Sequence, residues 1–395
     1  MLNFLVFNIL ARCVRTYVHD TLRKDIYKNP KKVNFGRKIF IFYYFCSRDW
    51  SLTTMTTMKQ QLYGASLKEI RSLCDRLQLP RFAAKQIVEW LYVHFATDID
   101  AMTNLSKVAR ERLKENCELG LSAPLKVSTS TDGTKKYLFR TAEGEYIESA
   151  LIPDGERMTL CVSSQAGCRM GCKFCATGRM GFRHQLSSTE IINQIISIPE
   201  RDRLTNIVFM GMGEPLDNID NLLLSLDILT SEWGMAWSPT RITVSTAGHA
   251  KNLPRLLDES KVHVAVSLHN PFPEERREIM PIENAYSIWE VCDILRRYDF
   301  THQRRVSFEY IVLEDMNCSP RHIKELSRLL DGIKCRINLI RFHKIPDSPF
   351  YSPALERIIE FRDTLTKRGI QTTLRASRGE DIEAACGLLS TAEKR

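Results

Sequence analysis

Three cysteines lie within the eight-residue segment "CRMGCKFC" at 168–175. Cys168, Cys172 and Cys175 are separated by three and then two residues, and the next cysteine along the chain is Cys292. A structural zinc site is closed by four ligands, usually in two close pairs. A cubic iron–sulfur cluster has four iron corners, so three thiolates leave one corner free for another ligand. The spacing therefore favours a metal site with one open position.

Short polar or glycine-containing segments follow five of the expected strands. In α/β barrels the reacting groups collect at the C-terminal ends of the strands. "GMGEP" (211–215) is the most informative of them, although Gly-X-Gly by itself is common in tight turns. After a buried strand it lets the backbone approach a ligand, and Glu214 offers a carboxylate for an ammonium group. The other segments are the cysteine segment, "ST" at 245–246, "SLH" at 267–269 and "RFH" at 341–343.

The elements around these segments predict an α/β protein. Six strand-like runs are each followed by a helical stretch, and Ser187 with Glu190 forms a capping box before the helix expected at 188–198. Such units imply a parallel sheet that right-handed crossovers curl into a partial (β/α)6 barrel. The expected strands are 158–164, 204–210, 241–246, 261–268, 305–313 and 335–340.

Two smaller regions precede the barrel. Helical periodicity is found at 66–77, 81–95 and 105–119, and Ser66 with Glu69 forms a capping box at the start of the first of these helices. Two β-like runs, 124–131 and 134–142, flank an Asp132–Gly133 hairpin signal. We therefore expect four parts: an atypical extension at 1–54, a helical accessory domain at 55–120, a β-hairpin connector at 121–157 and the barrel core at 158–390.

The net charge of +9 is unevenly distributed. Residues 1–54 hold ten Lys/Arg and three Asp/Glu, a balance of +7, so +2 remains for the rest of the chain. This segment resembles neither a signal peptide nor a membrane span, and we expect translation to begin at Met55 or Met58; a genuine short extension is the alternative. Local charge is more informative: residues 157–189 contain five basic residues and no acidic one, either a solvated face or a phosphate-attracting surface.

The pattern of three cysteines and a Gly-Gly-Glu-type loop after the second strand resembles the radical S-adenosylmethionine (SAM) superfamily, and Phe174 before the last cysteine fits it too. Four further motifs resemble the RlmN-like family of RNA adenine carbon-2 methyltransferases: "CVSSQAGCRMGCKFCATG", "GMGEPLDN", "INLIRFH" and "RGEDIEAACG". The match covers about residues 58–390. It implies one 4Fe-4S cluster on the three cysteines and two SAM molecules per turnover. The implied SAM contacts are Gly213, Glu214, Ser245, Ser267, Leu268, His269 and His343, the last at a position where other members carry asparagine.

The resemblance also implies the catalytic roles. Ring carbon-2 of adenine is electron-poor, so a radical adds to it where direct attack on the SAM methyl group fails. Cys386 would carry the methyl group, Cys161 would resolve the protein–RNA adduct through a transient disulfide, and Glu148 would accept the ring proton. Taken alone, Cys161 reads as a packed strand cysteine, Cys386 as a helical core cysteine and Glu148 as an exposed hairpin carboxylate.

The family further implies 23S-type rRNA at the peptidyl-transferase centre and tRNA 3′ of the anticodon as substrates. It also implies a low-potential electron donor such as flavodoxin or ferredoxin. We expect a cytoplasmic protein, because the cysteines form no disulfide framework. We also expect it to be a monomer that does not associate with membranes. Two alternatives remain: a sibling enzyme that methylates carbon-8 of the same rRNA adenosine, and a non-catalytic zinc-bearing RNA-binding protein. The helical front domain favours carbon-2.

Overall fold

The computed structural model describes residues 59–301 and 305–390, and the chain from Lys59 onward forms one compact unit. The expectations for residues 1–54 lie outside the described residues. Within these two ranges, no helix is long and apolar enough to cross a lipid bilayer.

The first described region is a small helical bundle. Its three helices are α3 (Leu67–Arg76), α4 (Ala83–Tyr92) and α5 (Lys107–Asn116), and β1 (Gln60–Gln61) pairs with β2 (Cys117–Glu118) beside them. The expected capping box is confirmed, because the Ser66 hydroxyl accepts from the Glu69 N–H and the Glu69 carboxylate accepts from the Ser66 N–H. Two buried tyrosines join the helices to the loops, since Tyr63 and Tyr92 donate to the carbonyls of Ala96 and Ala65.

Ten strands form the main sheet, in the order β14-β13-β12-β11-β10-β9-β6-β5-β4-β3. The strands from β6 to β14 are parallel, and the sheet ends at β14 and β3 without closing, so the expected partial barrel is confirmed. A seventh parallel strand, β14, was not predicted from the sequence. The parallel strands are β6 (Arg157–Cys161), β9 (Asn206–Phe209), β10 (Ile242–Thr246), β11 (His263–Ser267), β12 (Val306–Val312), β13 (Cys335–Arg341) and β14 (Gln371–Leu374).

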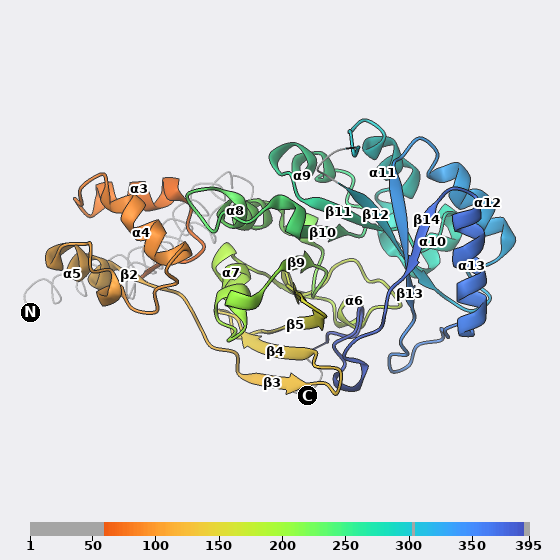
Figure 1. Ribbon diagram of the computed structural model, residues 1–395, viewed down its shortest axis with the longest axis horizontal. Helices are drawn as coiled ribbons and strands as arrows, with labels where there is room; N and C mark the ends of the chain where they lie inside the picture. Colours follow the sequence, from red (N-terminus) through yellow and green to blue (C-terminus); the bar gives the residue numbers. More distant parts are fainter. Residues whose placement is uncertain (1–58, 302–304, 391–395) are drawn as a thin grey trace, which may run out of the picture. The chain divides into compact units, whose positions relative to one another are not determined.

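Helices cover the outer face of the parallel strands (Figure 1). Among these helices, α7 packs on α8, α8 on α9 and α12 on α13, and the capping box of Ser187 and Glu190 begins α7 as expected. Alternate side chains of the strands fill the space between sheet and helices: Phe308 and Ile337, for example, are fully buried. The helices are α7 (Ser188–Ile196), α8 (Ile219–Thr230), α9 (Leu253–Glu259), α10 (Pro273–Ile279), α11 (Ile288–Leu295), α12 (Pro320–Leu329) and α13 (Leu355–Lys367).

The antiparallel strands continue the same sheet. The expected hairpin is present as β3 (Lys126–Thr129) and β4 (Lys135–Arg140), with Thr129 paired to Lys135. A further strand, β5 (Tyr146–Asp154), pairs with both β4 and β6 and so joins the hairpin to the barrel. The sequence of β5 shows no alternation of apolar and polar residues, because the polar residues Glu148 and Ser149 are buried together with their apolar neighbours.

Gly64 permits the closest approach between the helical bundle and the barrel. Its φ is +82°, and a Cβ built there would lie 2.3 Å from the backbone nitrogen of Thr189. The contact is reinforced because the hydroxyls of Ser188 and Thr189 donate to the carbonyls of Gly64 and Tyr63, both at 2.7 Å. The start of α7 therefore rests directly on the backbone of the bundle.

We expect Gly64→Ala to lower the free energy of unfolding by about 2–4 kcal/mol, from the left-handed backbone and the backbone clash together. Gly332→Ala is the matched control, because Gly332 has a φ of +77° and nothing within 4 Å of its built Cβ. The control should lose only about 1 kcal/mol. Denaturant unfolding of both variants measures this; equal losses would show that the bundle contact tolerates a methyl group.

Candidate active site

The cysteine loop, residues 168–175, lies between β7 (Gln165–Gly167) and the short helix α6 (Ala176–Met180). The backbone holds it by hydrogen bonds from the Cys168 N–H to the Gly181 carbonyl at 3.1 Å and from the Cys175 N–H to the Cys172 carbonyl at 3.2 Å. Gly178 packs on this turn, and a Cβ there would lie 2.8 Å from the Cys172 oxygen. The strand β8 (Phe182–Gln185) pairs with β7 in the antiparallel direction, so the cysteine loop and α6 connect two paired strands.

Cys168 and Cys172 are buried, Cys175 is half-buried, and the three thiols are electrostatically coupled. Burial raises the pKa of Cys168 to about 12 and the pKa of Cys172 well above its usual range, and the neighbouring cysteines act in the same direction. The pKa of Cys175 is raised by burial as well. Three ionised thiolates so close together need compensating positive charge, which a bound metal supplies as it displaces the thiol protons. The donor set therefore fits a cluster held by three thiolates.

Gly213 and Glu214 follow β9, beside the cysteine loop. Gly213 has a φ of +100°, and a Cβ there would lie 2.5 Å from the Gln165 side chain. The buried Glu214 carboxylate accepts from the Ala247 N–H at 2.6 Å and from the Leu216 N–H at 3.1 Å. Burial raises the pKa of Glu214 to about 7. A ligand ammonium group would favour its ionised form, so this carboxylate suits the amino-acid end of SAM.

A buried arginine that the sequence analysis missed ties the ends of β10 and β11 together. Arg276 is fully buried and forms an ion pair with Glu283. Its guanidinium also donates to the carbonyls of Ala247, Ser267 and Leu268 at 2.6–2.9 Å. It therefore fixes the backbone at two expected SAM contacts and places a positive charge near Cys172, whose pKa it lowers. Ser245 lies on β10, which pairs directly with β11.

His269 supports the cysteine loop. Its ring packs edge-on against Phe174, with 4.7 Å between the ring centres. The ring Nδ1 accepts from the Ile311 N–H at 2.9 Å. Burial lowers the pKa of His269 to about 3, so the ring is neutral at pH 7 and carries its proton on Nε2. The backbone of His269 has a φ of +57°, a strained conformation for a residue other than glycine.

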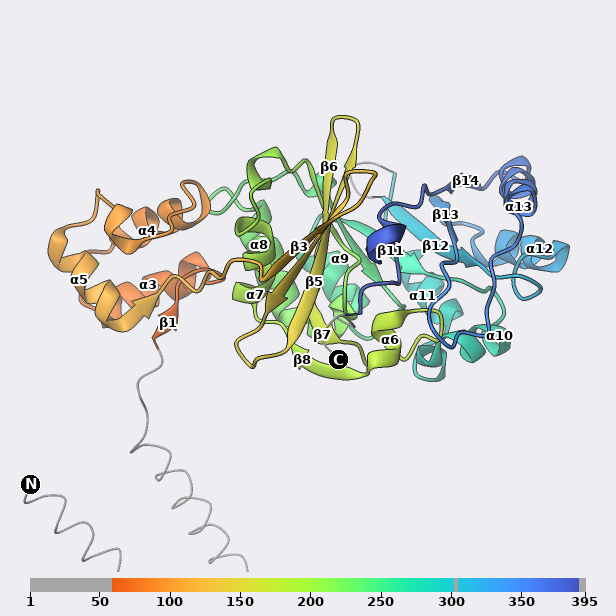
Figure 2. The ribbon, with the colours of Figure 1, turned by 90° about the horizontal axis from the view of Figure 1, so that it is seen from below.

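The C-terminal return segment, residues 375–390, crosses from β14 to the cysteine loop (Figure 2). At its far end, the Ala176 N–H donates to the Gly387 carbonyl at 2.8 Å and the Thr177 hydroxyl to the Leu389 carbonyl at 2.5 Å. At its near end, the β3–β4 turn holds it, because Asp132 accepts from the Gly379 N–H at 2.9 Å. Residues far apart in the sequence thereby bring Cys386 to the same end of the barrel as the cysteine loop.

Cys161 lies close enough to Cys386 for the two thiols to interact electrostatically. Cys161 ends β6 and packs in an apolar cluster with Ala384 of the return segment, whereas Cys386 is exposed. Arg375, a second residue that the sequence analysis missed, lies close to both thiols and forms an ion pair with the buried Glu309 at 3.2 Å. Burial raises the pKa of Cys161 to about 12, and Arg375 opposes this shift. The described cysteines are all free thiols.

Glu148 lies on β5 and faces the same segment. It is only 2% exposed, so the alternative of an exposed hairpin carboxylate is wrong. One carboxylate oxygen lies 3.3 Å from the Nζ of the buried Lys136, and the other accepts from the Ser390 N–H at 3.0 Å. The carboxylate is therefore held between a buried ammonium group and a backbone N–H of the return segment. No sequence pattern indicates that Lys136 is its partner.

His343 faces the return segment. Its Nε2 lies 3.0 Å from the Ser377 hydroxyl, and its Nδ1 lies 3.5 Å from the Glu380 carboxylate. Burial lowers its pKa. His343 and Cys386 line the same small cavity, of about 70 Å³.

The basic stretch of residues 157–189 does not form one surface. Arg169 pairs with Asp217 at 3.4 Å and stacks over the Phe182 ring. Arg179 donates to the Pro346 carbonyl. Arg157 instead begins β6 and lines a separate cavity.

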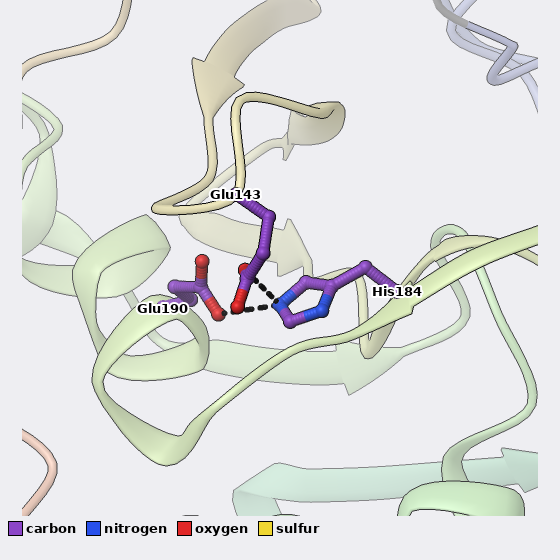
Figure 3. A group of neighbouring side chains, drawn as sticks. All are labelled: Glu143, His184 and Glu190. Carbon is purple, nitrogen blue, oxygen red and sulfur yellow. Dashed lines mark hydrogen bonds and ion pairs between the residues drawn. The ribbon is translucent and has the colours of Figure 1, made fainter. Parts of the chain in front are cut away.

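A second group of possible metal ligands, Glu143, His184 and Glu190, lies away from the thiols (Figure 3). Nε2 of His184 lies 2.7 Å from Glu143 and 3.4 Å from Glu190. Glu190 already accepts from the Ser187 N–H and hydroxyl and from the Ala142 N–H. Because these bonds occupy Glu190, we interpret the group as a contact that fixes the β4–β5 turn to the start of α7.

Comparisons with known proteins agree with this geometry. Residues 162–326 match the radical SAM superfamily, and residues 60–119 match the N-terminal domain of ribosomal RNA large-subunit methyltransferases. The chain is 56% identical over 340 residues to a probable dual-specificity RNA methyltransferase RlmN of Phocaeicola vulgatus, an alignment that covers 86% of this chain and 97% of that protein. It is 42% identical to the dual-specificity RNA methyltransferase RlmN of Syntrophus aciditrophicus, over 82% of this chain and 94% of that one.

A solved structure shows the same fold. The crystal structure of a radical SAM methyltransferase from Sphaerobacter thermophilus superposes with a TM-score of 0.78 and 42% sequence identity, covering 84% of this chain and 99% of that one. Membership implies a 4Fe-4S cluster, SAM and a source of electrons. Sequence identity above one half, the two domain matches and the three-cysteine loop lead to one conclusion: the chain belongs to the RlmN family of radical SAM RNA methyltransferases.

Proposed function

We propose that this enzyme methylates carbon-2 of adenosine in large-subunit rRNA, at the peptidyl-transferase centre, and in tRNA, 3′ of the anticodon. The observation that carries the proposal is the placement of Cys386. Its segment is hydrogen-bonded to the start of α6, directly after the cysteine loop, and packs against Cys161, so that a methyl carrier and a resolving thiol would share one site. A methyltransferase that passed the methyl group directly from SAM to RNA would need neither thiol.

The cofactor set is one 4Fe-4S cluster on Cys168, Cys172 and Cys175, with two SAM molecules consumed per turnover. When bound, the cluster supplies the electron that cleaves SAM to a 5′-deoxyadenosyl radical. Glu214 and the backbone of Gly213 would orient the amino-acid end of SAM. Arg276 holds Ser267 and Leu268 in place, and His269 holds Phe174 against the loop.

Cys386 would accept the first methyl group as a thioether. Loss of one hydrogen atom from that S-methyl group gives a carbon radical, which adds to adenine carbon-2 and joins protein to RNA. Glu148, whose carboxylate lies 3.3 Å from the Lys136 Nζ, would take the ring proton, and the adduct radical would give up one electron to the oxidised cluster, which restores the aromatic ring. Cys161, as its thiolate, would then attack the Cys386 sulfur, forming a sulfur–sulfur bond as the sulfur–carbon bond breaks. The released carbon would keep the electron pair of the broken bond and take up a proton, which completes the methyl group on the base. The external electron donor would reduce that disulfide before the next cycle.

The enzyme would work as a monomer in the cytoplasm, where its RNA substrates and a donor such as flavodoxin or ferredoxin occur. The helical bundle at 55–120 would contact RNA, which is supported by its match to an rRNA methyltransferase N-terminal domain. The carbon-8 sibling would use the same cysteines, and nucleoside mass spectrometry against 2-methyladenosine and 8-methyladenosine standards separates the two. The zinc-bearing binding protein has no support from the relatives, which are named methyltransferases.

We expect Cys172→Ala to abolish iron retention and to leave SAM intact in the presence of dithionite, because two thiolates cannot hold the cluster. Cys74→Ala is the control, since Cys74 is a buried thiol on α3. Iron analysis and chromatography of 5′-deoxyadenosine measure both variants. An iron-replete Cys172→Ala protein that still produced 5′-deoxyadenosine would contradict the assignment of the loop.

We expect the two other cysteines to differ in the step that they block. Cys386→Ala should form neither methylated RNA nor a covalent adduct. Cys161→Ala should form the adduct but fail to release it, because water is a far weaker nucleophile than a thiolate towards sulfur. The adduct would appear as a nuclease-sensitive shift on a denaturing gel. Normal product release by Cys161→Ala would mean that this thiol is only a packed core residue.

A further inference from the structure

The inner face of the partial barrel is polar. Side chains alternate along each strand, so Ser307 and Glu309 of β12 face one way while Phe308 and Tyr310 face the other. Tyr310 packs against Phe361 of α13, which places it on the helix-covered face. The inner faces of other α/β barrels are filled by branched apolar side chains. Here the face opposite the helices carries polar groups, and it is not filled.

A cavity of about 360 Å³ occupies this inner face. Its walls come from alternate residues of several strands, including Asn206 of β9 and Asn338 of β13. Arginines lie at the N-terminal ends of the strands: Arg157 begins β6, Arg305 precedes β12 and Arg336 is the second residue of β13. These three arginines mark the entrance of the cavity, which lies at the end of the barrel opposite to the cysteine loop.

The positive charge of the cavity is not neutralised. Glu309 is the only acidic residue among the described residues that line it, and that carboxylate pairs with Arg375. Over 59–301 and 305–390, none of Arg157, Arg305 and Arg336 forms an ion pair. The Arg157 Nε donates to the Thr159 hydroxyl at 3.2 Å, which orders its side chain at the rim.

The inner end of the cavity reaches the reaction centre. Arg375 lines both this cavity and the small one that contains Cys386. Its guanidinium lies 3.5 Å from the Met210 sulfur, and Met210 packs against the apolar cluster that includes Cys161. Arg375 and Met210 therefore lie between the cavity and the two thiols.

We propose that this cavity admits the RNA strand through the N-terminal mouth of the barrel, with Arg157, Arg305 and Arg336 binding phosphate groups that flank the target adenosine. This rests on the proposed function. Guanidinium groups match phosphate oxygens in charge and geometry. The cavity volume falls within the range of small-ligand sites, so it suits a single extruded nucleotide rather than a duplex.

An acidic electron-donor protein is the other partner that a basic surface could attract. The arginines line a concave cavity, whereas the cysteine loop that needs electrons lies at the opposite strand ends. A strand of RNA can enter such a cavity, and a folded protein can only cover its entrance. The geometry therefore favours RNA.

The test uses the reconstituted full-length enzyme and a tRNA transcript, with affinity measured over a series of KCl concentrations. We expect the double variant Arg157→Gln/Arg305→Gln to bind the transcript roughly tenfold more weakly. The slope of log affinity against log salt should fall by about 0.7–0.9 for each phosphate group that the variant no longer binds. Methylation of Cys386 by SAM, followed by intact-protein mass spectrometry without RNA, should be unchanged. Arg328→Gln, an exposed arginine on α12, is the matched control and should behave as wild type.

Two results would overturn the proposal. One is a double variant with the affinity and salt slope of Arg328→Gln. The other is unchanged RNA affinity with activity lost only when flavodoxin replaces dithionite, which would make the entrance a docking site for the electron donor. A failure of the proposed function gives a different result, in which the wild-type enzyme binds the transcript but yields no methyladenosine. The comparison of RNA affinities would still show whether Arg157 and Arg305 bind phosphate groups.

Discussion

One backbone hydrogen bond, from the Ala176 N–H to the Gly387 carbonyl, joins the start of α6, directly after the cysteine loop, to the end of the chain. The account of the active site depends on this closure, because Cys386 lies more than two hundred residues after Cys161. Neighbouring contacts support it: Thr177 binds the Leu389 carbonyl, and Glu148 binds the Ser390 N–H. The return segment is thus ordered at its far end by the loop that holds the cluster. A shift there would move the methyl carrier and the proton acceptor together.

Buried charges give this end of the barrel its chemistry. Arg276–Glu283, Lys136–Glu148 and Arg375–Glu309 are ion pairs in which at least one partner is nearly inaccessible to water. Such pairs add little net stability, but losing one partner costs about 3–5 kcal/mol, so both charges are retained together. Two of the cations also act on the thiols: Arg276 lowers the pKa of Cys172, and Arg375 lowers the pKa of Cys161. Burial by itself raises the thiol pKa values, and the arginines partly offset it.

The local features of the protein could be predicted from its sequence. The three-cysteine loop, the two capping boxes, the Asp132–Gly133 turn and most strands depend on residues close in the chain, and the structure contains them. The strands β5 and β14 were not predicted. Residues on both faces of β5 are buried, and β14 is a short strand at the edge of the sheet, so neither sequence shows a clear alternation of apolar and polar residues. Arg276 and Lys136 were missed for another reason. They lie in charged runs that usually face solvent, and only long-range packing brings them beside their carboxylates. The roles of the site residues remain proposals that rest on the family resemblance and on this geometry.

The central claim is that the methyl carbon passes through Cys386 and loses a hydrogen atom before it reaches RNA. The most direct test supplies SAM whose methyl group is fully deuterated, after any methyl group already on Cys386 has been turned over. Mass spectrometry then measures the deuterium content of the modified adenosine and of 5′-deoxyadenosine. The account predicts a product methyl group that has exchanged one deuterium for hydrogen, with the missing deuterium found in 5′-deoxyadenosine. A product that keeps all its methyl deuterium would contradict it, because the methyl group would then have been transferred intact.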